Sequence, residues 1–306
     1  MRCADLYIRI HTLPFTLVRK RAQMRPSPFA YSRPQHLAAA LAETALGAVP
    51  LAGGQSLIPA MRQREAAPAA LVDLNHIAEL PAALEWTAHS LRIGARVTHA
   101  QLLADATVAA RLPWLTQAVR ALGDVQVRQR GTPVGNVCWA DPRANLLVAL
   151  LAGEAVVQLQ GPADAAPRQL ALADFITGFR RTAVGAAIVI ALEVPLQFSQ
   201  GAYLEFSRQR QDLALVNLCV VRGAGSARVV LGGLDQRPLR LPAAEALLAA
   251  RPLSVGLDES ELAALFTGLA LDPPPDAHAP LAYRLQIAHE LLRRALIDLT
   301  GSRTHG

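Results

Sequence analysis

The chain has few cysteines, and they are widely spaced. Only Cys3, Cys138 and Cys219 occur among its 306 residues, and they show neither the spacing of a zinc or iron–sulfur site nor a disulfide framework. Their pattern suits a reducing compartment, so we expect the protein in the cytoplasm. Cys138 lies near a glycine-containing segment described below, and we expect it to be a small buried side chain.

Aromatic residues and long apolar runs are also scarce. Aromatics make up 5% of the chain, and its net charge of +6 comes almost wholly from scattered arginines. Nucleic-acid binding needs a basic stripe or a stacking platform, so we do not expect it. The most apolar stretch, residues 183–196, contains Glu193 and Pro195 and therefore predicts a buried strand rather than a membrane span. The arginine-rich surface favours docking to partner subunits instead.

Recognisable catalytic machinery is missing as well. The sequence offers no defensible nucleophile–base pair, no metal-ligand motif and no G-x-G-x-x-G fingerprint. His99 stands between Thr98 and Gln101 in a capping-box pattern, which predicts a first-turn helix residue rather than a general base. A bound cofactor is therefore the expected source of any chemistry.

Two glycine-containing segments carry most of the remaining information. The first, at 52–57, reads Ala-Gly-Gly-Gln-Ser-Leu and follows the apolar run at 48–51. Its glycines permit backbone angles that other residues avoid, and Ser56 could cap a helix that begins near Leu57. A strand, a glycine turn and a helix start leave N–H groups free for a phosphate. Taken alone, the pattern is more often a tight connection.

The second segment, at 131–136, reads Gly-Thr-Pro-Val-Gly-Asn. Thr132 and Asn136 can hydrogen-bond a polar ligand side-on, and the glycines permit its close approach. Together the two segments predict a diphosphate-containing cofactor held by backbone amides. Arg128 and Arg130 precede the second segment and could face the cofactor, a partner subunit or only solvent.

At these segments the chain resembles the FAD-binding medium subunits of molybdenum hydroxylases, the carbon monoxide dehydrogenase and xanthine dehydrogenase group. That family has loops of type A-G-G-x-S-L and G-T-I-G-G-N, and A-D-P-x-x-D-L follows the second. This chain has AGGQSL at 52–57, GTPVGN at 131–136 and ADPRANL at 140–146. The similarity runs from about Pro28 to Leu296, so it covers nearly the whole chain.

The resemblance implies an α+β protein with two domains. Residues 28–198 would form a two-part FAD-binding domain of the PCMH (vanillyl-alcohol-oxidase-like) type, with subdomains at about 28–80 and 81–198. Residues 199–299 would form a smaller α+β domain with an antiparallel sheet. We place the boundary near residues 198–201.

The two ends of the chain are expected to lie outside these domains. Residues 1–27 predict a disordered basic arm or an over-long gene start, with Met24 in place of Met1 as the true first residue. Residues 300–306 predict a flexible tail.

Hydrophobic periodicity predicts the main elements. Helices are expected at 34–46, 57–64, 112–123, 146–152, 243–250, 259–267 and 280–297. Strands are expected at 156–159, 188–192, 202–206, 216–221 and 229–231.

By resemblance, the loops and the A-D-P segment would bind FAD. The expected contacts are Ala52, Gly53, Gly54, Gln55, Ser56, Leu57, Thr132, Gly135, Asn136, Asp141, Asn145 and Val189. The first loop would hold the diphosphate, and the second would line the flavin or its diphosphate. Asp141 and Asn145 would support the loop and the ribityl contacts. Val189 would pack on the flavin ring or simply be part of the core.

The resemblance also implies a function. The subunit would take electrons from a [2Fe–2S] small subunit, which drains a molybdopterin-binding large subunit, and would pass them to an external acceptor such as a quinone, NAD or oxygen. A heterotrimer, or a dimer of heterotrimers, is the expected assembly. The substrate of the complex would touch another chain, so this sequence does not name it.

Four positions depart from the family pattern. Pro133 and Val134 replace Ile-Gly, Asn145 replaces aspartate, and Glu205 replaces lysine. Proline removes an amide donor, and valine adds a Cβ where the family has glycine. These changes motivate an alternative, a degenerate structural subunit without flavin. A third reading, an independent flavin oxidase, lacks a cluster of acid–base residues in the C-terminal domain.

Overall fold

The computed structural model describes residues 25–209, 211–250, 258–274 and 278–299. The predicted tail at 300–306 and nearly all of the predicted arm, residues 1–24, lie outside these ranges. Within the described ranges no helix is both long enough and apolar enough to cross a membrane.

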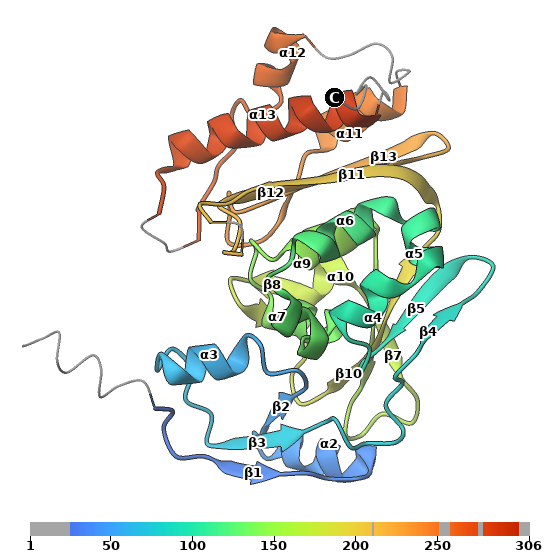
Figure 1. Ribbon diagram of the computed structural model, residues 1–306, viewed down its shortest axis with the longest axis vertical. Helices are drawn as coiled ribbons and strands as arrows, with labels where there is room; N and C mark the ends of the chain where they lie inside the picture. The colour runs from blue at the N-terminus through green and yellow to red at the C-terminus, as the bar shows by residue number, and fades with distance from the viewer. Residues whose placement is uncertain (1–24, 210, 251–257, 275–277, 300–306) are drawn as a thin grey trace, which may run out of the picture.

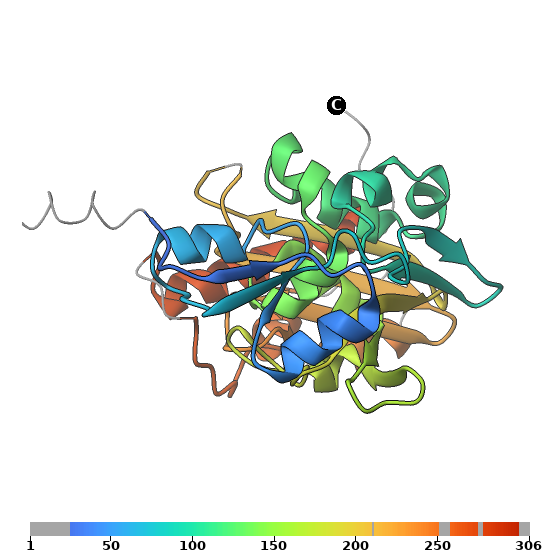
Figure 2. The same ribbon diagram turned by 90° about the horizontal axis from the view of Figure 1, so that it is seen from below.

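The first unit is a small parallel sheet with strand order β1-β3-β2. Its elements are β1 (Ala30–Ser32), α2 (Leu37–Ala45), β2 (Val49–Leu51), α3 (Leu57–Arg62) and β3 (Ala70–Asp73). Because β3 lies between the other two strands, the crossovers run in opposite directions, and their right-handedness leaves α2 and α3 on opposite sides of the sheet. The view from below shows this arrangement (Figure 2).

The second unit is an antiparallel sheet with strand order β4-β5-β10-β6-β7, covered by short helices. Its strands are β4 (Leu84–Trp86), β5 (Ser90–Gly94), β6 (Val156–Gln160), β7 (Arg168–Ala171) and β10 (Ile188–Pro195), beside the ribbon β8 (Ile176–Gly178) and β9 (Arg181–Thr182). The helices are α4 (His99–Ala104), α5 (Ala106–Arg111), α6 (Pro113–Ala121), α7 (Val125–Arg130), α8 (Pro133–Trp139), α9 (Asn145–Ala152) and α10 (Leu172–Phe175).

The C-terminal part is a four-stranded antiparallel sheet covered on both faces. Its elements are β11 (Phe198–Phe206), β12 (Val216–Gly223), β13 (Ser226–Gly232), β14 (Leu239–Arg240), α11 (Pro242–Ala250), α12 (Glu259–Ala264) and α13 (Leu281–Leu299). Figure 1 shows α13 and α11 on one face of this sheet and α6 and α9 on the other.

Strand β12 is apolar at nearly every position because both of its faces are buried. Leu218 and Val220 pack in the core shared with α11 and α13, whereas Cys219 and Val221 pack in the core shared with α6 and α9. Alternate side chains point to opposite faces, and both faces are covered here. Cys219 is fully buried for the same reason.

The structure differs from the predicted elements at two places. The helix predicted over 112–123 ends at Ala121, because Leu122 is extended and Gly123 has a φ of +49°; α7 then starts anew. Residues 198–201, predicted as a boundary, lie inside the continuous strand β11. Gly201 is needed in that strand because a Cβ there would lie 2.6 Å from Cδ1 of Trp114.

Candidate functional site

The first glycine loop connects β2 to α3 and is held from β3. Gly54 has a φ of +70°, which a residue with a Cβ rarely adopts. The side chain of Gln55 donates to the Gly53 carbonyl at 3.0 Å, and Asn75 Nδ2 donates to the Ala52 carbonyl at 3.1 Å. The helix start predicted at Leu57 is confirmed, although the Ser56 side chain makes no capping hydrogen bond.

The second loop joins α7 to α8. Gly131 ends α7, with its N–H donating to the Val127 carbonyl at 2.7 Å. Thr132 then caps α8, because its Oγ1 accepts from the N–H of Gly135 at 3.0 Å. The Thr132 hydroxyl oxygen, predicted as a ligand contact, therefore already shapes the loop.

The structure brings these two loops together. A Cβ added to Gly53 would collide with the carbonyl oxygen of Arg130 and lie 2.7 Å from Cα of Gly131. Real Cβ atoms do not approach backbone atoms so closely, so glycine at position 53 permits the first loop to pack directly on the second. The loops predicted to share one ligand are thus in backbone contact.

Several polar groups of the loops remain unused by the protein. The backbone N–H groups of Gly53, Gly54, Gln55 and Ser56 have no acceptor among the described residues. Oδ1 of Asn136 is buried and also lacks a partner there. An unpaired buried acceptor such as Asn136 Oδ1 is costly, and the N–H groups of the partly exposed first loop are free to donate, so a ligand that supplies acceptors to the first loop and a donor to Asn136 fits this site. A diphosphate and a hydroxyl-bearing chain have these properties.

The altered residues of the second loop cause no backbone strain. Pro133 is the first residue of α8, where its missing N–H would have no intrahelical partner. Val134 is absent from the non-glycine residues with positive φ in the described chain, and its side chain is 6% exposed within the first core. Glycine is therefore not required at position 134.

Asp141 of the A-D-P segment is fixed inside the protein. The Arg143 side chain donates to both its carboxylate oxygens at 3.0 Å, and Arg180 lies 3.4 Å away. Burial alone would raise the pKa of Asp141. The guanidinium groups of Arg143 and Arg180 outweigh that effect and hold the pKa below its usual value. Arg180 also bonds to Glu65 and stacks on Trp139 at 4.8 Å, so it ties the segment after α3 to α8.

Asn145 is committed to a contact that the sequence did not predict. Its Nδ2 donates to Oε2 of Glu205 at 2.6 Å, and the hydroxyl of Tyr203 donates to the same oxygen at 3.1 Å. Nδ2 of Asn217 donates to the Tyr203 hydroxyl in turn. Burial raises the pKa of Glu205. Two of the four departing positions are therefore hydrogen-bonded to each other.

Three other predicted residues have ordinary structural places. The predicted capping box at Thr98 is confirmed, and His99 is the first residue of α4; its backbone N–H donates to the Gly131 carbonyl. Burial lowers the pKa of His99 to about 4 and raises that of Cys138 to about 12, so the imidazole is neutral and the thiol is protonated at neutral pH. Val189 lies on β10 in the first core, 3% exposed.

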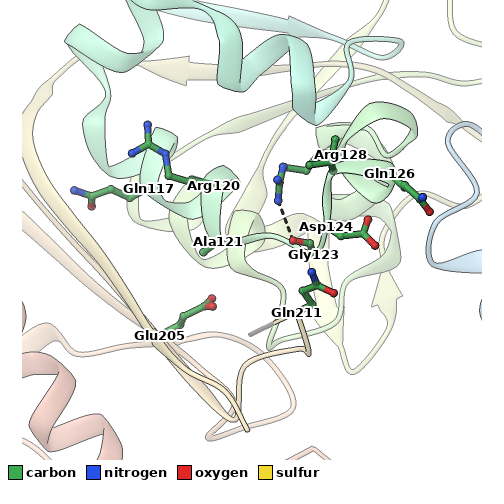
Figure 3. Close-up of a pocket in the computed structure, with 10 residues that line it drawn as sticks. Gln117, Arg120, Ala121, Gly123, Asp124, Gln126, Arg128, Glu205 and Gln211 are labelled. Atoms are coloured by element: carbon green, nitrogen blue, oxygen red, sulfur yellow. Dashed lines mark hydrogen bonds between the residues drawn. The ribbon is translucent and has the colours of Figure 1, made fainter. Parts of the chain in front are cut away.

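A cavity of about 710 Å³ lies beside the second loop, between α6, α7 and β11 (Figure 3). Its lining includes Glu205, Arg120, Arg128, Gln117 and Gln211. Sequence reasoning singled out only Arg128 and Glu205 of these. The glutamines carry no motif, and only the pairing of distant segments places them here. The described residues contain no cluster of side chains suited to a metal ion.

Two sequence families match the chain in succession. The family described as "FAD binding domain in molybdopterin dehydrogenase" matches residues 27–197. The family described as "CO dehydrogenase flavoprotein C-terminal domain" matches residues 201–299.

Known proteins align along most of the chain. The nicotine 6-hydroxylase medium subunit of Paenarthrobacter nicotinovorans is 31% identical over 260 residues, covering 83% of this chain and 90% of that protein. The carbon monoxide dehydrogenase medium chain of Afipia carboxidovorans is 33% identical over 286 residues, covering 89% and 97%.

Solved structures agree with these relatives. Reconstituted CO dehydrogenase from Oligotropha carboxidovorans contains a chain with a TM-score of 0.82 and 30% identity, and the match covers 92% of this chain and 100% of that one. Quinoline 2-oxidoreductase from Pseudomonas putida 86 gives a TM-score of 0.80 and 28% identity, covering 91% and 99%.

Proposed function

This chain belongs to the FAD-binding medium subunits of molybdenum hydroxylase-type dehydrogenases, and from that premise we propose that it passes electrons from the [2Fe–2S] clusters of a partner to an external acceptor. Its cofactor is FAD, and it is a subunit of an oxidoreductase. The backbone contact between the loops at 52–57 and 131–136 carries the proposal, because it joins the two segments expected to bind one cofactor.

The chain's own residues would bind and position the FAD. The free N–H groups from Gly53 to Ser56 suit the diphosphate, and Oδ1 of Asn136 suits a hydroxyl or N–H donor. Asp141 would keep the second loop in place through Arg143 and Arg180. The bound flavin would supply the electron chemistry, which side chains do not provide.

Several finer points belong to the same proposal. We place the FAD-binding domain at 28–198, with parts at 28–80 and 81–198, and the C-terminal domain at 199–299; the family matches, which end at 197 and begin at 201, support this. The partners would be a molybdopterin-binding large subunit and a [2Fe–2S] small subunit, in a heterotrimer or a dimer of heterotrimers. Free thiols at Cys138 and Cys219 suit the cytoplasm.

Two of the four departing positions no longer favour the alternative of a structural subunit without flavin. Pro133 stands where its missing N–H is tolerated, and Val134 has an ordinary backbone. Only Asn145 and Glu205 still favour it, because Asn145 Nδ2 is used within the protein.

The test is to express the chain with the genes of its partner subunits and to record the visible spectrum of the released cofactor. Roughly one FAD per chain, as expected for a single site, would support the proposal. A folded complex without flavin would reject it in favour of the structural subunit.

A further inference from the structure

Asp73 is a buried carboxylate at the end of β3, and the FAD contacts proposed above do not use it. Strand β3 is the central strand of the first sheet, with β1 on one side and β2 on the other. Asp73 is 7% exposed, and in the register of the sheet it lies opposite Leu51, the last residue of β2. Because the first glycine loop starts directly after Leu51, Asp73 stands beside the point where that loop leaves the sheet.

The two carboxylate oxygens of Asp73 accept from different parts of the chain. Oδ2 accepts from the Tyr31 hydroxyl of β1 at 2.5 Å, and Arg33 forms an ion pair with the same oxygen at 3.9 Å. Oδ1 accepts twice from Asn75, from its backbone N–H at 2.9 Å and from its Nδ2 at 2.7 Å. Burial would raise the pKa of Asp73, but the hydrogen bonds from Tyr31 and Asn75 outweigh burial and hold the pKa below its usual value.

Asn75 connects this carboxylate to the glycine loop. Its Nδ2 also donates to the Ala52 carbonyl at 3.1 Å. A carboxylate and a carbonyl can only accept, so the amide must present Nδ2 to both, and both N–H bonds of Nδ2 are then used. Asn75 is an exposed residue, so hydrogen bonds rather than core packing hold its amide in this orientation.

Holding the Ala52 carbonyl also sets the direction of a backbone donor. The carbonyl shares one planar peptide group with the N–H of Gly53, and in a trans peptide the two bonds point in opposite directions. The Gly53 N–H therefore points away from Asn75, free for a ligand. Gln55 fixes the next peptide group in the same way, since its side chain donates to the Gly53 carbonyl at 3.0 Å.

We propose that Asp73 and Asn75 are positioning residues of the FAD site. Asp73 holds the Asn75 amide, and Asn75 holds the peptide group between Ala52 and Gly53, so that the Gly53 N–H is already directed for the diphosphate before FAD binds. Neither side chain touches the cofactor. A loop that is ordered in advance loses less conformational entropy on binding, which raises the affinity. The inference rests on the proposed function in one respect, that the first loop binds the diphosphate.

Asn75→Ala removes the link to the loop at an exposed position, where folding is least affected. FAD titration of the flavin-free, full-length chain should show binding at least about tenfold weaker than in the parent, the factor expected when the backbone of one residue must be ordered on binding. Ser32→Ala is the matched control, because it removes one hydrogen bond, to Glu43, elsewhere in the same unit. The control should bind FAD like the parent, and an equally tight Asn75→Ala would overturn the proposal.

The double variant Asp73→Ala/Asn75→Ala tests whether Asp73 acts through Asn75. If it does, both single variants and the double variant lose the same affinity, within about twofold. Independent roles would multiply the losses to roughly a hundredfold and would contradict the assignment. If Asp73→Ala does not fold, Asn75→Asp replaces it: a carboxylate there would face two acceptors, so FAD should bind more weakly than to Asn75→Ala, and parent-like binding would refute the link.

Hydrogen exchange of the flavin-free chain separates this inference from the proposed function. The Ile58 N–H donates to the Gly54 carbonyl at 3.0 Å, so its exchange rate reports whether the loop is held. Exchange at Ile58 should be faster in Asn75→Ala and unchanged in Ser32→Ala, and an unchanged rate in Asn75→Ala would reject the positioning role. If the parent chain binds no FAD, the proposed function fails, while this measurement still decides whether Asn75 holds the loop.

Discussion

Gly53→Ala is the sharpest test of the contact between the two loops. The added Cβ would meet the Arg130 carbonyl and lie 2.7 Å from Cα of Gly131. Carbon atoms prefer a separation of about 3.5–4.0 Å, so the loops must move apart by roughly 1 Å. Overpacking of this kind costs about 1–3 kcal/mol.

The cost can appear in two measurable ways. If the loops stay in contact, the free energy of unfolding of the flavin-free chain falls, and Tm drops by about 2–12 °C, at roughly 2–4 °C per kcal/mol. If the loops separate instead, FAD must bring them back, and its affinity weakens by about 5- to 150-fold. Calorimetry of the flavin-free chain and an FAD titration measure the two effects.

Gly178→Ala is the matched control. A Cβ at Gly178 would meet only the Arg181 side chain, at 3.7 Å, an ordinary contact. This variant should stay within about 0.5 kcal/mol of the parent protein and bind FAD normally. Normal Tm and normal FAD affinity in Gly53→Ala would refute the loop contact.

Three further predictions concern single side chains. Burial lowers the pKa of His99 from 6.5 to about 4, so the stabilisation from the neutral, buried imidazole is complete above pH 6.5 and is lost as the pH falls toward 4. In denaturant unfolding, the parent protein should lose about 3 kcal/mol of its free energy of unfolding over this range, and His99→Leu should not show this loss. An equal pH dependence in both proteins would contradict the prediction. Val134→Gly restores the family residue. It should lower the free energy of unfolding by about 2–3 kcal/mol, because it leaves a cavity in the core and places a glycine inside a helix, and it should not raise the FAD content. A gain in FAD content would show that valine obstructs the site. Arg180→Lys keeps the charge but loses stacking on Trp139 and the shared hydrogen bonds to Asp141 and Glu65, so a loss of about 1–2 kcal/mol is expected in thermal unfolding, and an unchanged Tm would reject that role.

Local sequence patterns predicted the features that depend on near neighbours. The capping box at Thr98 and the helix start at Leu57 were confirmed because capping and turn geometry involve residues only a few positions apart. The apolar runs at 188–192 and 216–221 form strands, since backbone pairing and burial on both faces suit them.

Contacts between distant segments could not be predicted in the same way. We predicted a domain boundary near residues 198–201, yet strand β11 runs through them, and Gly201 lets Trp114 pack against that strand. The hydrogen bond between Asn145 and Glu205 joins α9 to β11, and the sequence around each residue contains no pattern that predicts it. The cavity beside α7 likewise forms between segments that are far apart in the sequence.

The sequence by itself determined the family, the two-domain α+β class and the two glycine loops, because these follow from motifs and periodicity along the chain. Only the tertiary structure decided how those features act. It set Gly53 against the Arg130 carbonyl, turned Val134 into a core residue and placed Glu205 in the wall of a cavity. The physical reason is that packing and hydrogen bonding depend on distance in space, which a linear pattern does not contain.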